Sequence, residues 1–404
     1  MSGIQNKLTA DLAVLQLKKR EERRIRAGHL WIYSNEIDTV KTPLKDFQPG
    51  DPVAILSDSG KALGIGYVNP HSLICARLVS RDLRQGMDQT LFVNRINQAL
   101  ALRQRLFEAP YYRLIYGEAD GLPGLVVDRF GEYLVVQCTT AGMERLKSEI
   151  VQALEEVLQP TAILIRNDSS IRELEGLERY VEAVGTVPEW VDIEENGVPF
   201  RTSLHLGQKT GWYYDHRDNR QRLARYSEGK RVLDLFSYRG AWGIQAAMQG
   251  ATEVTCVDSS AQALEGVVEN AGLNDAQDRV STIQGDVFDI LRSLRQEGRQ
   301  FDVVISDPPA FIKRRKDSKK GLEAYQRLNR LAMQVLSDDA ILVSASCSFH
   351  LAPEQLGNVA LQAARQENRG LQILERGFQA VDHPVHPAIP ETAYLKAIFC
   401  RVLS

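Results

Sequence analysis

The sequence has few cysteines and no long apolar stretch. Its five cysteines are scattered at positions 75, 138, 256, 347 and 400, without a CxxC pair. This spacing argues against a disulfide framework or a zinc site and favours a reducing cytosol. No apolar run approaches the roughly 20 residues of a membrane helix, and the N-terminus lacks the apolar core of a signal peptide. We therefore expect a cytoplasmic protein with no metal and no membrane contact.

The 404 residues are 44% apolar and 25% charged, which predicts two or three globular domains. The net charge is only -3, but residues 1–82 carry 12 Lys+Arg against 9 Asp+Glu, a local excess of positive charge. Most of that excess lies in residues 18–26. Both a nucleic-acid contact and a solvated basic face fit this pattern, and the charge alone does not separate them.

Residues 230–260 have the pattern of a nucleotide-binding unit. An apolar strand is expected over 231–236, followed by a turn of small residues and a helix that includes 244–248. A second apolar strand, 254–257, ends in Asp258. Strand, tight turn, helix and strand ending in an acid form one half of a doubly wound fold.

The acids in this unit indicate the ligand. Asp258 is placed to accept the ribose hydroxyls of an adenosine. The turn is not GxGxxG, since position 237 is Ser, which disfavours a dinucleotide. Asp234 precedes the turn and suits a cationic ligand, so we predict S-adenosylmethionine. Its predicted contacts in this unit are Asp234, Ser237, Gly240 and Asp258.

Later strands end in further polar residues. After the expected strand 280–283, Asp286 is predicted to bond the adenine amino group, with Val287 and Phe288 against the ring. After strand 301–306, Asp307-Pro308-Pro309 forms a rigid corner that directs Asp307 toward the cofactor and the substrate. Upstream, the segment 207–217 either lines the amino-acid end of the cofactor, through Thr210 and Asp215, or is a packing loop.

Cys347 is the strongest catalytic candidate. It follows the apolar strand 340–345 and is flanked by serines, whereas the other cysteines lie in apolar, strand-like contexts. A thiolate that adds to C6 of a pyrimidine makes C5 nucleophilic toward a sulfonium methyl. A base must then remove the C5 proton. Asp307 is the candidate partner at the N3 edge, and the target base must be unstacked, which favours single-stranded or loop RNA.

Two segments are predicted to contact RNA. Lys313, Arg314, Arg315 and Lys316, with Lys319 and Lys320, form a basic loop next to the expected methyl donor. Residues 1–82 read as a small β-rich barrel. Arg24 and Trp31 are its candidate RNA contacts, and Trp31 either stacks on a base or belongs to the barrel core.

The motifs resemble, in order and nearly end to end, the RlmI family of large-subunit ribosomal RNA methyltransferases, which make 5-methylcytosine. The matching segments are RxxRGHxW-like Arg24 to Trp31, GEADGLPGLVVDRFG at 117–131, GQKTGWYYDHRDNR at 207–220, LDLFSYRGAWG, VDSS, GDVF, SDPPAF, SCS and DHP…YLKAIFCRV. The resemblance implies an α/β protein with a PUA-like RNA-binding β-barrel over 1–82, a central α+β domain over 83–190 and a Rossmann-like class I methyltransferase domain over 191–404. Its implied partner is 23S ribosomal RNA or an assembling large subunit, and the protein is expected as a monomer or homodimer.

The sequence departs from many RNA cytosine-C5 methyltransferases at one point. Residues 307–311 read DPPAF, without the second cysteine that those enzymes use for product release. By analogy with uridine-C5 methyltransferases, Glu391 is the candidate base. The alternatives are a uridine-C5 or other base methyltransferase, and a non-catalytic RNA-binding factor in ribosome assembly.

Overall fold

The computed structural model describes residues 12–207 and 210–404, and the chain forms two compact units. The first comprises Met1–Glu189, Gln208–Thr210 and Asp382–Thr392, and the second comprises Trp190–Gly207, Gly211–Val381 and Ala393–Ser404. The predicted domain boundaries after residues 82 and 190 stay a prediction.

The first unit begins with a five-stranded sheet in the order β1-β3-β4-β5-β2. Its elements are β1 (Ala13–Gln16), α2 (Glu22–Arg26), β2 (Trp31–Ile32), β3 (Asp51–Leu56), β4 (Ala62–Val68) and β5 (Ala76–Ser80). Two glycines let β4 approach β5 closely. A Cβ on Gly64 would lie 2.3 Å from the Ser80 carbonyl oxygen, and one on Gly66 would lie 2.1 Å from that of Arg77.

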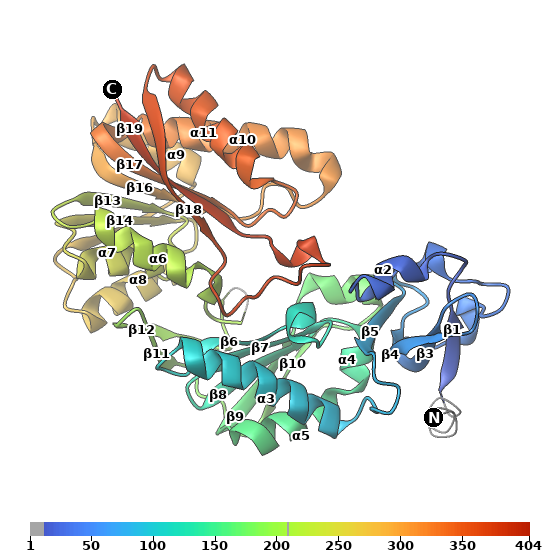
Figure 1. Ribbon diagram of the computed structural model, residues 1–404. Coiled ribbons are helices and arrows are strands. Elements are labelled where there is room, and N and C mark those ends of the chain that lie inside the picture. Colours follow the sequence, from blue (N-terminus) through green and yellow to red (C-terminus); the bar gives the residue numbers. More distant parts are fainter. Residues whose placement is uncertain (1–11, 208–209) are drawn as a thin grey trace. The chain divides into compact units, whose positions relative to one another are not determined.

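A second sheet in this unit has the order β10-β9-β8-β7-β6. Its strands are β6 (Tyr111–Tyr116), β7 (Leu125–Phe130), β8 (Tyr133–Cys138), β9 (Ala162–Asn167) and β10 (Tyr180–Val184). The helices α3 (Gln89–Leu106) and α5 (Lys147–Leu158) lie side by side along it (Figure 1). A shorter helix, α4 (Ala141–Arg145), precedes α5 and is separated from it at Leu146.

The second unit opens with the hairpin of β11 (Val191–Glu195) and β12 (Val198–Thr202) and the helix α6 (Arg217–Leu223). A seven-stranded sheet follows in the order β15-β14-β13-β16-β17-β19-β18. Its strands are β13 (Arg231–Leu235), β14 (Glu253–Asp258), β15 (Val280–Gln284), β16 (Phe301–Ser306), β17 (Leu336–Ser346), β18 (Gly370–Phe378) and β19 (Lys396–Leu403).

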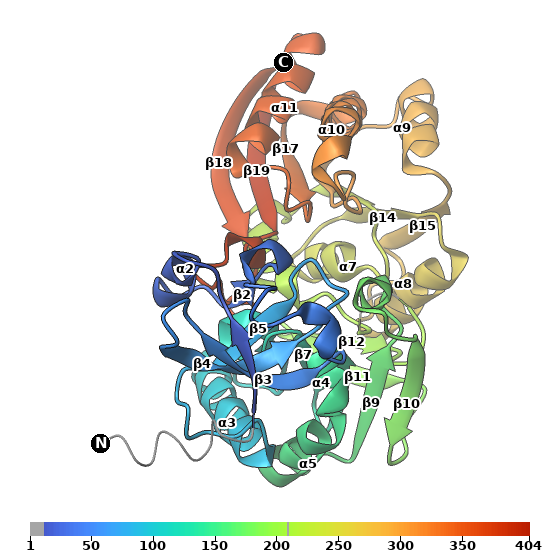
Figure 2. The same cartoon turned by 90° about the vertical axis from the view of Figure 1, so that its right-hand side faces the viewer.

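The strands β13 to β17 are parallel, and β19 runs antiparallel between β17 and β18. These last three strands stand together at one edge of the sheet (Figure 2). The order reverses between β13 and β16, which is where ligands bind in doubly wound sheets. This architecture confirms the predicted fold class.

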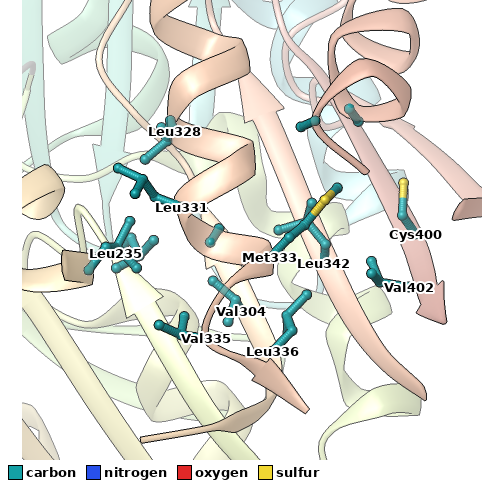
Figure 3. Close-up of a cluster of buried hydrophobic side chains, with 14 of the residues drawn as sticks. Leu235, Val304, Leu328, Leu331, Met333, Val335, Leu336, Leu342, Cys400 and Val402 are labelled. Carbon is teal, nitrogen blue, oxygen red and sulfur yellow. The ribbon is translucent and has the colours of Figure 1, made fainter. Parts of the chain in front are cut away.

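Helices cover both faces of the seven-stranded sheet. They are α7 (Ala241–Met248), α8 (Ala261–Leu273), α9 (Val287–Gln296), α10 (Ser318–Met333) and α11 (Pro353–Gln366). Helices α6 to α8 lie on one face and α9 to α11 on the other (Figure 1). Leu235, Val304, Leu328 and Leu342 belong to the core between the sheet and the second group (Figure 3). The elements β10, β18, α9, α10 and α11 were not predicted from the sequence.

Short 3-10 helices complete the description: η1 (Ser34–Glu36), η2 (Leu44–Asp46), η3 (Gly117–Asp120), η4 (Ser170–Glu175), η5 (Tyr214–His216), η6 (Ala224–Tyr226), η7 (Arg315–Asp317) and η8 (Pro390–Thr392). Among the helices of the described residues, none combines the length and the apolar character needed to cross a bilayer.

Candidate active site

Four parallel strands of the second unit end at one edge of the sheet and bring the predicted site residues there. The strand register places four features at this edge: the turn after β13, Asp258 at the end of β14, Asp307 after β16 and Cys347 after β17. Because the carboxyl ends of parallel strands meet at the same edge, local patterns far apart in the sequence form one site.

The turn between β13 and α7 has an unusual backbone. Phe236, Tyr238 and Gly240 all have positive φ, at 62°, 50° and 81°. Asp258 stabilises this turn, since its Oδ2 accepts a hydrogen bond from the Tyr238 backbone N–H at 2.9 Å and its Oδ1 accepts one from the Ser260 N–H at 2.9 Å. Non-glycine residues at positive φ are costly, and they persist only where such contacts hold them.

Asp234 is fully buried beneath the turn. Its Oδ2 accepts a hydrogen bond from the Gly243 N–H at 3.0 Å, but its Oδ1, like the Ser237 hydroxyl, has no hydrogen-bond partner among the described residues. Burial raises the pKa of Asp234 to about 8, and the negative charges of Asp307 and Asp258 add to the shift. Buried polar atoms without partners at a ligand-binding edge are groups that a cofactor can satisfy. The site therefore fits a ligand with cationic and hydroxyl groups.

Asp307 is held by two side chains that the sequence analysis had not singled out. His216 Nε2 lies 3.1 Å from its Oδ1, and Trp242 Nε1 donates to its Oδ2 at 3.1 Å. Burial would raise the pKa of Asp307, but the charge and hydrogen bond of His216 and the hydrogen bond of Trp242 outweigh it, so the pKa is lowered. Asp307 is therefore an anionic acceptor whose orientation is fixed.

Aromatic side chains surround these acids. Tyr394 donates its hydroxyl hydrogen to Asp215 Oδ2 at 2.5 Å. The Tyr213 ring meets the Tyr238 ring edge-on at 5.5 Å. Burial raises the pKa of Tyr213, as do the negative charges of Tyr238, Asp215, Asp307 and Cys347. Tyr213 therefore lies among the predicted cofactor and catalytic residues.

Cys347 differs from the other cysteines because it is only half-buried. Burial raises the pKa of Cys75, Cys138 and Cys400 to about 12, and that of Cys256 well above its usual value. Those four thiols are inert at neutral pH. Cys347 is thus the one cysteine of the chain, all five being described, that is open to a substrate.

The serines beside Cys347 fix its backbone. The Tyr325 hydroxyl lies 2.7 Å from Ser346 Oγ and 2.9 Å from Ser348 Oγ, and all three residues are buried. The backbone N–H of Ile312, in the segment after Asp307, donates to Ser348 Oγ at 3.1 Å. The serines therefore turn inward and attach the end of β17 to α10 and to the corner after β16.

The residues predicted to hold the adenine lie around the start of α9. Asp286 caps α9, accepting hydrogen bonds at Oδ1 from the backbone N–H groups of Phe288 and Asp289 at 2.9 and 3.2 Å. Val287 is only 3% exposed and belongs to the hydrophobic core, and its contact with the adenine stays a prediction. The first turn of α9 directs it inward, because the helix begins at Val287 itself. Phe288 is half-buried beneath the Arg327 guanidinium, which lies 4.9 Å from the ring.

Two predicted site residues lie in the first unit. The buried Thr210 hydroxyl donates to Asp128 Oδ2, and Asp128 also accepts two hydrogen bonds from Arg113 at 2.8 and 2.7 Å. Glu391 is exposed in η8 and lines a cavity of about 700 Å³ together with Trp31 and Tyr116. The roles of Thr210 and Glu391 stay predictions. Gln208 and Lys209, from the same motif as Thr210, lie outside the described residues.

The predicted RNA contacts differ in their surroundings. Lys313, Arg314, Arg315 and Lys316 are all exposed, and none has an acidic partner within the described residues. In the first unit, Arg24 donates to the Trp31 carbonyl at 2.9 Å, and the indole N–H of Trp31 donates to Glu118 Oε1 at 2.8 Å. Trp31 is thus half-buried and anchored at its polar edge.

Sequence reasoning missed Tyr213, His216, Trp242, Tyr394 and Lys396. Tyr213 and His216 belong to the matched GWYYDH stretch, Trp242 to the turn motif and the other two to the C-terminal motif. Their positions in these motifs were thus a signal for all five. The partners of Trp242 and Tyr394 lie 65 or more residues away in the sequence, so no local pattern indicated these pairings.

Comparison with known proteins gives the class. Residues 15–81 match the model of a PUA-like domain, and residues 144–401 match that of an S-adenosylmethionine-dependent methyltransferase. The chain is therefore an S-adenosylmethionine-dependent methyltransferase with an N-terminal PUA-like domain, which confirms the predicted enzyme class and cofactor.

Similar proteins narrow this class. The ribosomal RNA large subunit methyltransferase I of Aliivibrio fischeri (strain ATCC 700601 / ES114) is 38% identical over 395 residues, covering 96% of this chain and 99% of that protein. The protein of that name from Erwinia tasmaniensis is 37% identical over 398 residues, with the same coverage. The chain belongs to the ribosomal RNA large subunit methyltransferase I family, as the motifs had indicated.

Solved structures support the fold alone. A methyltransferase candidate complexed with SAH superposes with a TM-score of 0.83 at 21% identity, covering 96% of this chain and 100% of that one. A candidate S-adenosylmethionine-dependent methyltransferase from Streptococcus mutans gives a TM-score of 0.81 at 22% identity, with the same coverage.

Proposed function

We propose that this protein transfers a methyl group from S-adenosylmethionine to C5 of a cytosine in large-subunit ribosomal RNA. The observation that carries the proposal is the half-buried Cys347 at the same sheet edge as Asp307, in a chain whose relatives are named ribosomal RNA large subunit methyltransferases. The substrate is 23S ribosomal RNA or an assembling large subunit, in the cytoplasm.

The cofactor is held by the turn after β13 and the acids around it. Asp234 and Ser237 offer the polar atoms that lack partners, Gly240 lets the backbone turn, and Asp258, Asp286 and Asp215 supply further acceptors. When bound, S-adenosylmethionine supplies an electrophilic methyl group.

Cys347 begins the reaction. Its thiolate adds to C6 of the cytosine, and the electrons displaced from the C5–C6 double bond make C5 nucleophilic. After the methyl group has been transferred to C5, a base removes the C5 proton, the double bond returns and the C6–S bond breaks. By the sequence analogy with uridine-C5 methyltransferases, Glu391 is the proposed base.

Asp307 orients the target base. As a carboxylate it accepts a hydrogen bond from the exocyclic amino group of cytosine, beside the N3 edge, rather than donating one. His216 Nε2 and Trp242 Nε1 each lie 3.1 Å from an oxygen of Asp307 and hold the carboxylate in place. Asp307 therefore discriminates the amino group of cytosine from the carbonyl of uracil, which offers no donor there.

The test is methyl transfer to ribosomal RNA from cells that lack the protein, with labelled cofactor and digestion to nucleosides. We expect label in 5-methylcytidine, and Cys347→Ala should abolish it without loss of cofactor binding. Cys75→Ala, which changes a buried and inert thiol, is the matched control and should retain transfer. Label in 5-methyluridine would show that the target base is uracil and not cytosine. RNA binding without any label would favour the assembly-factor alternative.

A further inference from the structure

Lys396 is a buried cation next to the proposed nucleophile. It begins β19 and is paired in register with Ser346, the residue before Cys347. The residue is only 4% exposed. A lysine is almost never buried to this degree unless a partner compensates its charge.

Lys396 donates hydrogen bonds to two backbone carbonyls of the segment that follows Cys347. Its Nζ donates to the carbonyl oxygen of Ser348 at 2.6 Å and to that of Leu351 at 2.8 Å. Within the described residues, no carboxylate oxygen lies within the 4.0 Å of an ion pair. Two neutral carbonyls satisfy two of its three N–H groups but do not neutralise the charge.

Cys347 is an ionisable residue at these contacts, because it lies between Ser346, the register partner of Lys396, and Ser348, whose carbonyl Nζ bonds. Burial lowers the pKa of Lys396 to about 8, and the negative charge of a Cys347 thiolate opposes that shift. The interaction is reciprocal, because a nearby ammonium favours the thiolate over the thiol.

We propose that Lys396 is the counter-ion of the Cys347 thiolate, and thus a positioning residue that keeps the nucleophile ionised before the RNA binds. This inference deepens the proposed function, since it concerns the nucleophile assigned there. The proton of the thiol goes to the solvent, and the charge left on sulfur is balanced by the ammonium. When the thiolate adds to C6, that balance is lost, and release of the product restores it.

The test measures the ionisation of Cys347 directly, in the free full-length enzyme. Iodoacetamide alkylates the thiolate by forming an S–C bond and releasing iodide, and the modified peptide is quantified by mass spectrometry across pH 5 to 10. Lys396→Gln removes the charge but keeps a hydrogen-bond donor for the carbonyls, and Lys396→Met removes both. Lys396→Arg, which keeps the charge, is the matched control.

We expect the alkylation midpoint to rise by about one pH unit or more in Lys396→Gln and Lys396→Met, and to stay near the wild-type value in Lys396→Arg. An unchanged midpoint in both neutral variants would overturn the proposal, since a role limited to holding the loop does not move the thiol pKa. Because this assay uses neither RNA nor methyl donor, its result is independent of whether the protein methylates cytosine.

A reciprocal measurement serves if the neutral variants do not fold. In Cys347→Ser the lysine keeps its carbonyl contacts but loses its counter-ion, so the pKa of Lys396 should fall further. An NMR titration of the lysine Cε resonance compares this variant with the wild type. An identical Lys396 pKa in the two proteins would refute the pairing.

Discussion

At the scale of single residues, the site combines acidic side chains that differ in protonation state. Asp307 is anionic because His216 and Trp242 stabilise its charge, whereas Asp234 is buried with one oxygen unpartnered and retains its proton near neutral pH. Such opposed pKa shifts at one edge of a sheet are typical of functional sites. They also affect stability, which makes them measurable without substrate.

The raised pKa of Asp234 should make the cofactor-free protein less stable as the pH rises. Between about pH 4 and 8 the folded protein keeps a proton that the unfolded chain has lost, so the free energy of unfolding falls across this window. Asp234→Asn removes this effect. Its stability relative to the wild type should therefore increase with pH, by at most about 1.4 kcal/mol per unit.

Urea unfolding at pH 5, 6 and 7 measures this difference. Asp302→Asn is the control, because the hydrogen bonds and charge of Arg231 lower the pKa of Asp302, despite the opposing effect of burial. The stability that Asp302 contributes is present above its unfolded pKa and is lost only at lower pH, so its variant should show a constant difference from pH 5 to 7. A constant difference for Asp234→Asn would contradict the assignment.

The Tyr325 hydroxyl is buried, but it should matter for catalysis because it contacts the serines on both sides of Cys347. Tyr325→Phe leaves Ser346 Oγ and Ser348 Oγ without their shared partner, which should cost about 1–3 kcal/mol of stability. It should also slow methyl transfer, because Cys347 lies between the two serines. Rates with saturating cofactor, together with the cofactor Kd, check this. A slowed rate with an unchanged Kd is expected, and an unchanged rate would show that the serines do not position the thiol.

At the scale of elements, the turn between β13 and α7 depends on close packing of α7 against β14. A Cβ on Gly243 would lie 2.7 Å from Cys256 Sγ and 3.0 Å from Val254 Cγ1. Gly243→Ala should therefore displace α7, lowering stability by about 1–3 kcal/mol and weakening cofactor binding. Gly272→Ala, in α8, is the control, because its Cβ would meet no heavy atom within 4 Å. It should be neutral or stabilising, by roughly 0.5–1 kcal/mol.

The segment Lys313 to Lys316 should account for part of the salt dependence of RNA binding. Replacing its four cations with Ala should reduce the slope of log K against log[salt] by about 0.7 for each cation that contacts single-stranded RNA, up to about 3 in total. A variant that exchanges Lys and Arg at these positions keeps the charge and should keep the slope. If the Ala variant also keeps it, the segment is merely solvated.

At the scale of the whole molecule, the division into units does not follow the sequence order. Residues 382–392 belong to the first unit, although the chain before and after them belongs to the second. Within the first unit, Arg103 Nη2 donates to the Asp382 carbonyl at 2.9 Å, and the Arg113 backbone N–H donates to Asp382 Oδ2 at 2.9 Å. Asp382, His383 and Ile389 are buried.

A fragment of residues 190–404 should therefore be poorly soluble, because segment 382–392 would lack the partners that bury it. Replacing 382–392 with a Gly/Ser linker of equal length should restore a soluble fragment that binds S-adenosylmethionine. Size-exclusion chromatography and calorimetric titration with the cofactor distinguish the two fragments. Equal behaviour would mean that the segment does not need the first unit.

The sequence by itself determined the architecture of the methyltransferase unit and singled out Cys347 as the candidate nucleophile. Apolar runs, turn residues and acids at strand ends are local signals, so Asp234, Asp258, Asp307 and Cys347 were predicted at the edge where the structure places them. The ordered motifs identified the family for the same reason, since they need no knowledge of contacts. The predicted strand limits deviate most at β17, which spans Leu336–Ser346 and not 340–345.

Only the tertiary structure decided how these residues are paired and which side chains face the site. Val287 lies in the core because of the point at which α9 begins, and Thr210 and Glu391 belong to the first unit. His216 meets Asp307, and Lys396 meets the loop after Cys347, across separations that no local pattern records. Charge, burial and hydrogen bonding act through space, and these interactions determine which groups are ionised in the site.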